Sequence, residues 1–297
     1  MSRGALASTA TKPAGGPPKK PASIHAISSV TATITEKGGG PAKFVETFGA
    51  LCSMMMDASW LTVESIVKRR FAWREFAEQA WFLASVSVLP ALLIALPFGV
   101  VIVLEVGGLA ASIGATSFVG AVDAVGTVRE AAPIITALVL SGAGGSAICS
   151  DLGSRTIRDE LSALNVMGID PVERLVAPRL LAAVLVAVLL NGIVALAGVV
   201  SGYVAAVFIL HGSAGGFLNS FSSFSQPADL IESELKAAIF GLIAASVASY
   251  KGMNVERGPA GVGEAVNQSV VITGISLFLL NLVFTEIFLV LVPPRVL

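Results

Sequence analysis

Charged residues are scarce in this 297-residue chain, at 13% of the total, whereas 55% of the residues are hydrophobic. A soluble domain of this length needs more polar groups to cover its surface, so the scarcity excludes a soluble globular fold and indicates a bilayer as the solvent. The 20 acidic residues balance 19 basic ones, for a net charge of −1. The chain therefore has no basic excess to attract nucleic acid.

Histidine and cysteine are also rare, with two of each. His25 and His211 make no metal site, and Cys52 and Cys149 have no metal-ligand spacing. We expect the cysteines to be packing residues rather than a disulfide. Because no nucleophile stands beside a base, we expect no catalytic residue, no metal and no cofactor on this chain, and the pattern disfavours a membrane-embedded enzyme.

Two different segments precede the apolar part of the chain. Residues 1–42 form a tail rich in Pro, Gly, Ser and Lys without the apolar core of a secretory signal, and this composition predicts disorder. The first acidic residue of the tail is Glu36, which leaves an organelle-transit segment open as an alternative. Residues 43–70 place apolar side chains at helical spacing among polar ones and predict an amphipathic helix at the membrane interface.

Five apolar runs follow, each long enough for the ~20 residues that a spanning helix requires. They predict one all-α integral membrane domain over 43–297, with spans at about 81–106, 128–150, 175–210, 230–250 and 266–292. Pro90 and Pro97 predict a kink or a break in the first span.

The basic residues predict the orientation. Lys and Arg are absent from the expected connections 107–127 and 211–228. The opposite side of the five-span arrangement carries Lys68, Arg69, Arg70, Arg74, Arg155, Arg158, Arg174, Arg179, Lys251 and Arg257. By the positive-inside rule, we expect a multi-pass protein of the cell membrane with a cytoplasmic N-terminus and an external C-terminus.

The charged connection between the second and third spans predicts a short cytoplasmic helix over 154–168. Ser154 is the expected N-cap, Gly168 the expected C-terminus, and Asp170-Pro171 the turn that follows.

This expected helix is amphipathic, because Leu161, Leu164 and Met167 share one face. A mere connector between two spans has no need for an apolar face in water. The pattern therefore favours a surface for a protein partner.

Ionisable residues near the expected outer ends of the spans are costly at membrane depth and need partners. Glu105, Arg129 and Glu130 are expected to pair at the mouth of a cavity, and a solvated helix end is the alternative. Glu232 and Lys236 stand four residues apart with the acid first, which favours a helical ion pair near the interface.

Small residues at four-residue spacing allow helix backbones to approach closely in lipid. The expected packing or dimerisation positions are Ser141, Gly145, Gly198 and Gly202. The segment 142–146 is Gly-rich but lacks the following lysine of a phosphate-binding loop, so the nucleotide site is expected on another chain.

The segment Glu160-Leu-Ser-Ala-Leu-Asn-Val-Met-Gly-Ile-Asp-Pro171, together with 128–147 before it, resembles the MlaE/YrbE permease family. Further matches are Lys236, Phe240-Gly241, Tyr250-Lys-Gly252, Gly261-Val-Gly263, Asn281 and Thr285. The likeness extends from about 44 to 292. Many family members have Gly-Arg-Val-Gly-Ser where this chain has Gly142-Ala-Gly-Gly-Ser146, a form similar to the actinobacterial YrbE branch, so no role of that arginine is carried over.

The resemblance implies the permease subunit of an ABC transporter that works with MCE lipid-transfer proteins on a lipid substrate. It implies a coupling helix that docks into a separate cytoplasmic ATPase, which binds ATP and Mg²⁺. The coupling residues would be Glu160, Leu161, Leu164, Met167, Gly168, Asp170 and Pro171. The candidates for a lipid pocket at the interface with a second permease subunit are Glu105, Arg129, Glu130 and Lys236. A paralogue is favoured over a second copy as that subunit.

Two other functions remain open from the sequence. A proton-coupled secondary transporter would use Glu105, Glu130 or Glu286 as proton carriers. A non-transporting anchor for MCE proteins is the other alternative.

Overall fold

The computed structural model describes residues 72–112, 114, 118–256 and 258–291, with residues 49, 53, 55 and 56 before them. The chain divides into two units, 1–50 and 51–297, and the second unit contains all the helices discussed below. The expected tail and most of the expected interfacial helix over 43–70 lie outside the described residues.

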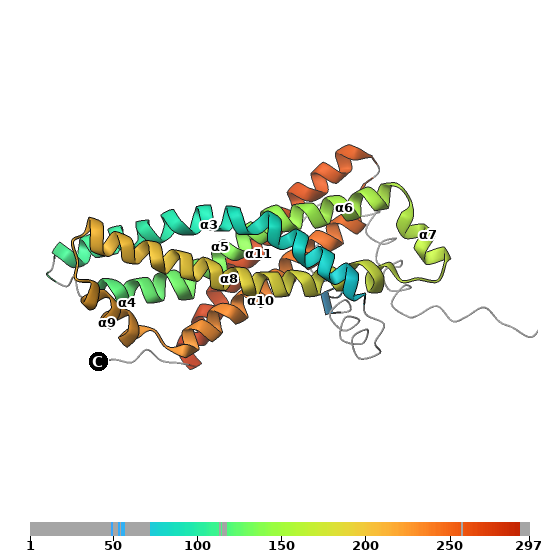
Figure 1. The fold of residues 1–297 in the computed structure, drawn as a ribbon. Helices are drawn as coiled ribbons and strands as arrows, with labels where there is room; N and C mark the ends of the chain where they lie inside the picture. The colour runs from blue at the N-terminus through green and yellow to red at the C-terminus, as the bar shows by residue number, and fades with distance from the viewer. Residues whose placement is uncertain are drawn as a thin grey trace, which may run out of the picture. The chain divides into compact units, whose positions relative to one another are not determined.

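The secondary structure of the described residues is helical, without strands, which confirms the expected all-α class (Figure 1). The helices in chain order are α3 (Trp73–Ser112), α4 (Val119–Asp123), η2 (Ala124–Ala131), α5 (Ala132–Val139), η3 (Leu140–Gly145), α6 (Ser146–Ile157), α7 (Glu160–Val166), η4 (Val172–Val176), α8 (Ala177–Val204), η5 (Ala205–Ile209), α9 (Ala214–Phe224), α10 (Pro227–Met253) and α11 (Pro259–Leu291). The segments labelled η are π-helical, with wider turns than the α-helices that they join.

Four helical stretches of the described chain are long and apolar enough to cross a membrane. They are Trp73–Ala110, Val119–Ile157, Val172–Ile209 and Pro259–Phe288. The fourth expected span is α10, which has 27 residues and is therefore about 40 Å long. Its first half carries Asp229, Glu232, Glu234 and Lys236, so α10 has the length of a span but not the apolar composition.

Three segments differ in detail from the expectations. The first helix runs without a break through Pro90 and Pro97, since neighbouring helices in a bundle support the turn that a proline weakens. The expected connection 107–127 contains the end of α3, which continues to Ser112, and is helical again from Val119 onward. The Gly- and Ser-rich connection 211–228 likewise contains α9, which Ser213 caps by accepting a hydrogen bond from the backbone N–H of Gly216 at 3.3 Å.

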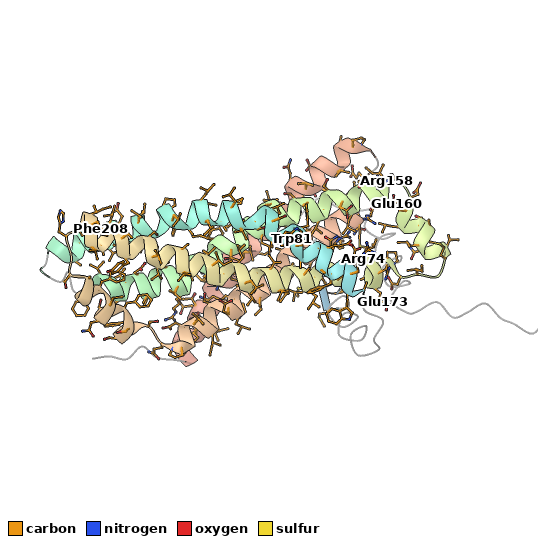
Figure 2. The ribbon with its side chains drawn as sticks, in the orientation of Figure 1. Arg74, Trp81, Arg158, Glu160, Glu173 and Phe208 are labelled. Atoms are coloured by element: carbon orange, nitrogen blue, oxygen red, sulfur yellow. The ribbon has the colours of Figure 1, made fainter. Side chains whose placement is uncertain are left out.

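The bundle is built around α3 and α8, which lie side by side and make the most extensive helix contact (Figure 1). Helix α10 packs on α8, α6 and α11, while α4 packs on α9 at one end of the bundle. Helix α7 lies at the opposite end (Figure 1). Figure 2 shows the same two ends of the bundle: Arg158 and Glu160 lie near α7, and Phe208 lies at the far end.

The backbones of this bundle approach closely at two glycines of α8. A Cβ atom on Gly198 would lie 2.5 Å from Thr127 Cγ2, and one on Gly202 would lie 2.8 Å from Asp123 Oδ1. Asp123 is itself buried and accepts a hydrogen bond from Thr127 Oγ1 at 2.6 Å. The four expected packing residues, Ser141, Gly145, Gly198 and Gly202, are all buried. At Gly198 and Gly202 the close packing is therefore within one chain.

Candidate functional site

A cluster of charged side chains joins three helices that are distant in sequence. Its charged members are Arg129, Glu130, Asp229, Glu232 and Lys236, and we name them the η2–α10 cluster. Asn281, Thr285 and Phe288 of α11 complete its surroundings. The cluster brings together residues of η2, α10 and α11.

Lys236 is the centre of the η2–α10 cluster and is fully buried. Its Nζ lies 2.8 Å from Glu232 Oε1 and 3.3 Å from Glu130 Oε1, and it donates a hydrogen bond to Thr285 Oγ1 at 3.0 Å. The i,i+4 pair expected between Glu232 and Lys236 is therefore present, but it is buried rather than exposed at an interface. Burial makes the pair far more sensitive to loss of one partner than a surface pair.

Arg129 is the second cation, and its guanidinium is also largely buried. Its Nε lies 3.0 Å from Glu232 Oε2 and 3.8 Å from Glu130 Oε1, and its Nη1 lies 3.9 Å from Asp229 Oδ1. The ring of Phe288 covers the guanidinium at 4.6 Å from the ring centroid, a favourable cation–π arrangement. The alternative of a solvated helix end is therefore wrong for Arg129.

Glu130 links the cluster to α11. It accepts hydrogen bonds from Asn281 Nδ2 and from Thr285 Oγ1, each at 3.2 Å. Since Lys236 donates to the same threonine hydroxyl, Thr285 bridges the lysine and the carboxylate. The polar side chains of α11 thus fix the position of the Glu130 carboxyl group.

Local structure positions these side chains. Arg129 and Glu130 lie on the π-helical segment η2, and widened turns of this kind are common at functional sites. Helix α10 begins with Pro227 in its first turn and a capping box, in which Asp229 accepts a hydrogen bond from the backbone N–H of Gln226 at 2.9 Å. Asp229 therefore both caps α10 and faces Arg129.

The cluster contains three of the four expected lipid-pocket candidates: Arg129, Glu130 and Lys236. The fourth, Glu105, is exposed on α3 and forms no ion pair with a described residue, so its expected pairing with Arg129 and Glu130 is wrong. The position of Glu105 near the end of a span does not determine the direction in which its side chain points.

Sequence analysis did not assign Asp229, Asn281, Thr285 or Phe288 to the site. Asn281 and Thr285 stand four residues apart in the largely apolar second half of the last span. Two polar side chains on one helical face inside a membrane need partners, and this signal identifies them without a structure.

The connection between the second and third spans differs from the helix expected over 154–168. Helix α6 continues to Ile157, and Ser154 lies inside it, where its hydroxyl donates to the Asp151 carbonyl oxygen instead of capping a helix. The chain then turns at Asp159, whose φ is +56°, and α7 occupies only Glu160–Val166. We call the region from α6 to Asp170 the α6–α7 hairpin.

The apolar face of α7 also points differently from the expectation. Leu161 is buried in the core of the chain, and Leu164 packs against the same core. The bundle of the same chain therefore buries Leu161 and covers Leu164 in part, so this face of α7 is turned toward the bundle. The exposed apolar side chains are Val166, Met167 and Ile169, which lie at the end of α7 and in the turn after it.

A second group of charges joins the α6–α7 hairpin to the bundle, and we call it the α6–α8 network. Arg179 is fully buried and donates a hydrogen bond from Nη2 to Asp151 Oδ2, while Glu75 lies 3.9 Å away. Arg155 pairs with Asp151 at 3.2 Å. The network connects the starts of α3 and α8 to α6.

Among the described residues, no group of three His, Cys, Asp or Glu side chains is arranged to hold a metal ion. The Cys149 thiol is free and buried.

A family model described as Permease MlaE matches residues 76–287. The chain belongs to the MlaE permease family. This membership confirms the resemblance seen in the sequence. The matched region of this MlaE-family permease contains both the η2–α10 cluster and the α6–α7 hairpin, and only Phe288 of the cluster's surroundings lies beyond it.

Individual relatives agree with membership in the MlaE family. The chain is 31% identical over 216 residues to a "Probable ABC transporter permease protein" of Synechocystis, which is 73% of this chain and 82% of the relative. It is 27% identical over 202 residues to the "Intermembrane phospholipid transport system permease protein MlaE" of Haemophilus influenzae, which is 68% of this chain and 77% of the relative. It is also 27% identical over 176 residues to the chloroplastic protein Trigalactosyldiacylglycerol 1 of Arabidopsis thaliana, where the match covers 59% of this chain and 50% of the relative.

Proposed function

We propose that this chain is the membrane permease subunit of an ATP-driven lipid transporter. The observation that carries the proposal is the family match over 76–287, which includes both a buried polar cluster and a protruding hairpin. Relatives named as an ABC transporter permease and as an intermembrane phospholipid permease support it. In this proposal a separate cytoplasmic ATPase subunit binds ATP and Mg²⁺ and performs the hydrolysis.

The proposed ATPase contact is the tip of the α6–α7 hairpin. Val166, Met167 and Ile169 are 89%, 63% and 42% exposed there. Apolar side chains gathered at the end of a hairpin, outside the apolar spans, favour burial against a partner protein. The proposal therefore replaces Leu161 and Leu164 with Val166 and Ile169 as contact residues and retains Met167.

The remaining expected coupling residues stabilise the conformation of the hairpin tip. Gly168 has φ +75°, a backbone conformation that residues with a side chain rarely adopt. Asp170 Oδ1 accepts a hydrogen bond from the backbone N–H of Val172 at 2.8 Å. Pro171 precedes η4 with φ −61°, which suits the start of a helix. Glu160 begins α7 and pairs with Arg158 at 2.8 Å.

A continuous helical stretch between the η2–α10 cluster and the α6–α7 hairpin supports coupling between these two sites. The residues from Val119 to Ile157 form one uninterrupted helical stretch, with Arg129 and Glu130 near its start and the α6–α7 hairpin at its end. A rod of this kind transmits a displacement at one end to the other, as rigid elements do in switching proteins. The η2–α10 cluster would then be displaced when the ATPase moves α7.

The same proposal includes the orientation and the partners. In it, the α6–α7 hairpin lies in the cytoplasm and the η2–α10 cluster lies toward the outer side of the cell membrane, an orientation that the basic residues near the hairpin support. The lipid pocket would lie beside Glu130 at the interface with a second permease subunit, for which a paralogue is favoured. MCE proteins would exchange lipid with it outside the membrane.

Disruption of the hairpin tip tests the ATPase contact. We expect Met167→Asp to abolish co-purification of the ATPase with the permease, because a carboxylate is costly to bury in an apolar interface. Asn165→Asp adds the same charge at an exposed polar position of α7 and serves as the matched control. Unchanged co-purification and ATP turnover in Met167→Asp would contradict the proposed contact.

Lipid movement tests the transport activity. The assembled complex in lipid vesicles is expected to move a fluorescent lipid with ATP and not with a non-hydrolysable analogue. Movement that needs only a proton gradient would instead favour a proton-coupled secondary transporter. A complex that binds MCE proteins but moves no lipid would favour the membrane anchor.

A further inference from the structure

Asp123 is an acidic residue buried at the end of α4, in the part of the bundle that lies farthest from α7 (Figure 1). The residue is 0% exposed, and its Oδ1 atom accepts a hydrogen bond from Thr127 Oγ1 at 2.6 Å. Its Oδ2 atom is buried and has no hydrogen-bond partner among the described residues. A buried polar atom without a partner requires a physical explanation.

The side of this carboxyl group that faces α8 has no room for a water molecule or an ion. A Cβ atom on Gly202 of α8 would lie 2.8 Å from Asp123 Oδ1 and 2.9 Å from Asp123 Oδ2. The same Cβ atom would lie 2.9 Å from Cγ2 of Val103, a residue of α3. The carboxyl group is therefore packed tightly against α8, next to an apolar side chain of α3.

No charged side chain in the described part of the chain pairs with Asp123. Helix α9, which packs on α4, contains no charged residue. On α3, the acidic residue at this end is Glu105, which is exposed. On α8, the titratable residue at this end is Tyr203, whose ring packs against an aromatic ring of α9. On η2, the charged residues are Arg129 and Glu130, which belong to the η2–α10 cluster.

An ionised carboxylate in this position would have one hydrogen bond, from Thr127, but no cation beside it. Burial of such a charge costs far more than burial of the neutral acid. We propose that Asp123 is a proton-binding site, at which the carboxyl group holds a proton where α4 packs against α8. The proton is part of the folded structure and is not moved across the membrane. The inference does not depend on the proposed lipid transport.

The position of Asp123 gives the proton a structural role. Asp123 lies near the start of the helical stretch from Val119 to Ile157. The neutral acid allows this end of the stretch to pack against Gly202, whereas the ionised form needs water that the packed contact does not admit. An aspartate in an unfolded chain ionises at a pH of about 3.9. At higher pH the folded chain therefore binds one proton more than the unfolded chain, and its stability falls as the pH rises.

The pH dependence of unfolding tests the proposal. The full chain and Asp123→Asn are unfolded by denaturant in detergent micelles at about pH 5 and about pH 6, where an ordinary aspartate is ionised. Asparagine is uncharged and keeps an oxygen that accepts the hydrogen bond from Thr127. The equilibrium constant for unfolding of the unmodified chain, divided by that of Asp123→Asn, is expected to rise about tenfold per pH unit. A ratio that is the same at both pH values overturns the proposal.

Asp159→Asn is the matched control for this experiment. Asp159 is exposed and has φ +56°, a backbone conformation that asparagine tolerates. The ratio of equilibrium constants between the unmodified chain and Asp159→Asn is expected to be independent of pH. A tenfold rise in this ratio as well would overturn the assignment of the proton to Asp123.

Infrared spectroscopy gives a second test, which begins with the unmodified chain and needs no variant to fold. With isotope-labelled aspartate carboxyl groups, the folded chain at about pH 6 is expected to show the label-shifted C=O stretching band of a neutral carboxylic acid. Absence of this band overturns the proposal, because every aspartate would then be ionised. In Asp123→Asn the band is expected to disappear, and its persistence would overturn the proposal by placing the proton on another aspartate.

Discussion

The two groups of charged side chains in this chain differ in how their charges are shielded. In the η2–α10 cluster, the cation Lys236 and its partner Glu232 are both buried, with exposed fractions of 0% and 5%. In the α6–α8 network, Arg179 is 0% exposed, but Asp151 and Glu75 are 40% and 30% exposed. Charge is therefore buried on both sides of the first pair and on one side of the second.

This difference has an energetic consequence. Removal of one member of a buried ion pair leaves the other charge without compensation, whereas a partly exposed carboxylate regains its hydration when its partner is removed. The buried Lys236–Glu232 pair is therefore expected to depend on both of its members, and the α6–α8 network is expected to tolerate change.

The largest expected effect is that of Lys236→Met. The methionine fills much of the lysine volume but leaves Glu130 and Glu232 without the buried ammonium, so we expect a loss of about 3–5 kcal/mol in the free energy of unfolding. Unfolding in mixed detergent micelles, followed by fluorescence of the tryptophans, measures this loss.

A matched control for this variant lies on the same helix. Lys251→Met changes a partly buried lysine that donates a hydrogen bond to the exposed Gln268, and its expected loss is below about 1 kcal/mol. Equal losses in the two variants would show that burial of Lys236 and Glu232 does not govern the cost.

A smaller effect is expected for the neutral member of the cluster. Thr285→Val keeps the shape of the side chain but removes the hydroxyl between Lys236 and Glu130, for an expected loss of about 1–3 kcal/mol. Thr273→Val on the same helix is the control, because that buried hydroxyl has no hydrogen-bond partner among the described residues. The same unfolding assay is used, and a loss in Thr273→Val as large as in Thr285→Val would contradict the bridging role.

The sequence predicts the helices well, because apolar length alone identifies a spanning helix. It misses α9, whose many Gly and Ser residues are typical of a connection, although burial of Phe217 holds it in place. It predicts the Glu232–Lys236 pair from spacing along one helix. The contact between Glu130 and Lys236 joins residues 106 positions apart and depends on how two helices pack, which spacing does not encode.

Helix rotation explains why Leu161, Leu164 and Glu105 point differently from the expectation. The periodicity of α7 shows that Leu161 and Leu164 share a face, but not whether that face meets the bundle or a partner protein. The bundle covers it in the structure. Likewise, the sequence places Glu105 and Arg129 near the same end of their spans. It does not show that the side chain of Glu105 is exposed on α3 and does not meet Arg129.

The smallest effect is expected for Arg179→Met. The Nε and Nη1 atoms of Arg179 are buried and have no hydrogen-bond partner within the described part of the chain, so the folded chain bears a desolvation cost for this cation that is only partly offset by Asp151. Methionine removes that cost, and the half-exposed carboxylates left behind are hydrated. We therefore expect a change in the free energy of unfolding within about 1 kcal/mol of zero, of either sign, in the assay used for Lys236→Met. A loss as large as that of Lys236→Met would mean that the carboxylates of the α6–α8 network are as dependent on their cation as those of the η2–α10 cluster, and that exposure of the partner does not govern the cost.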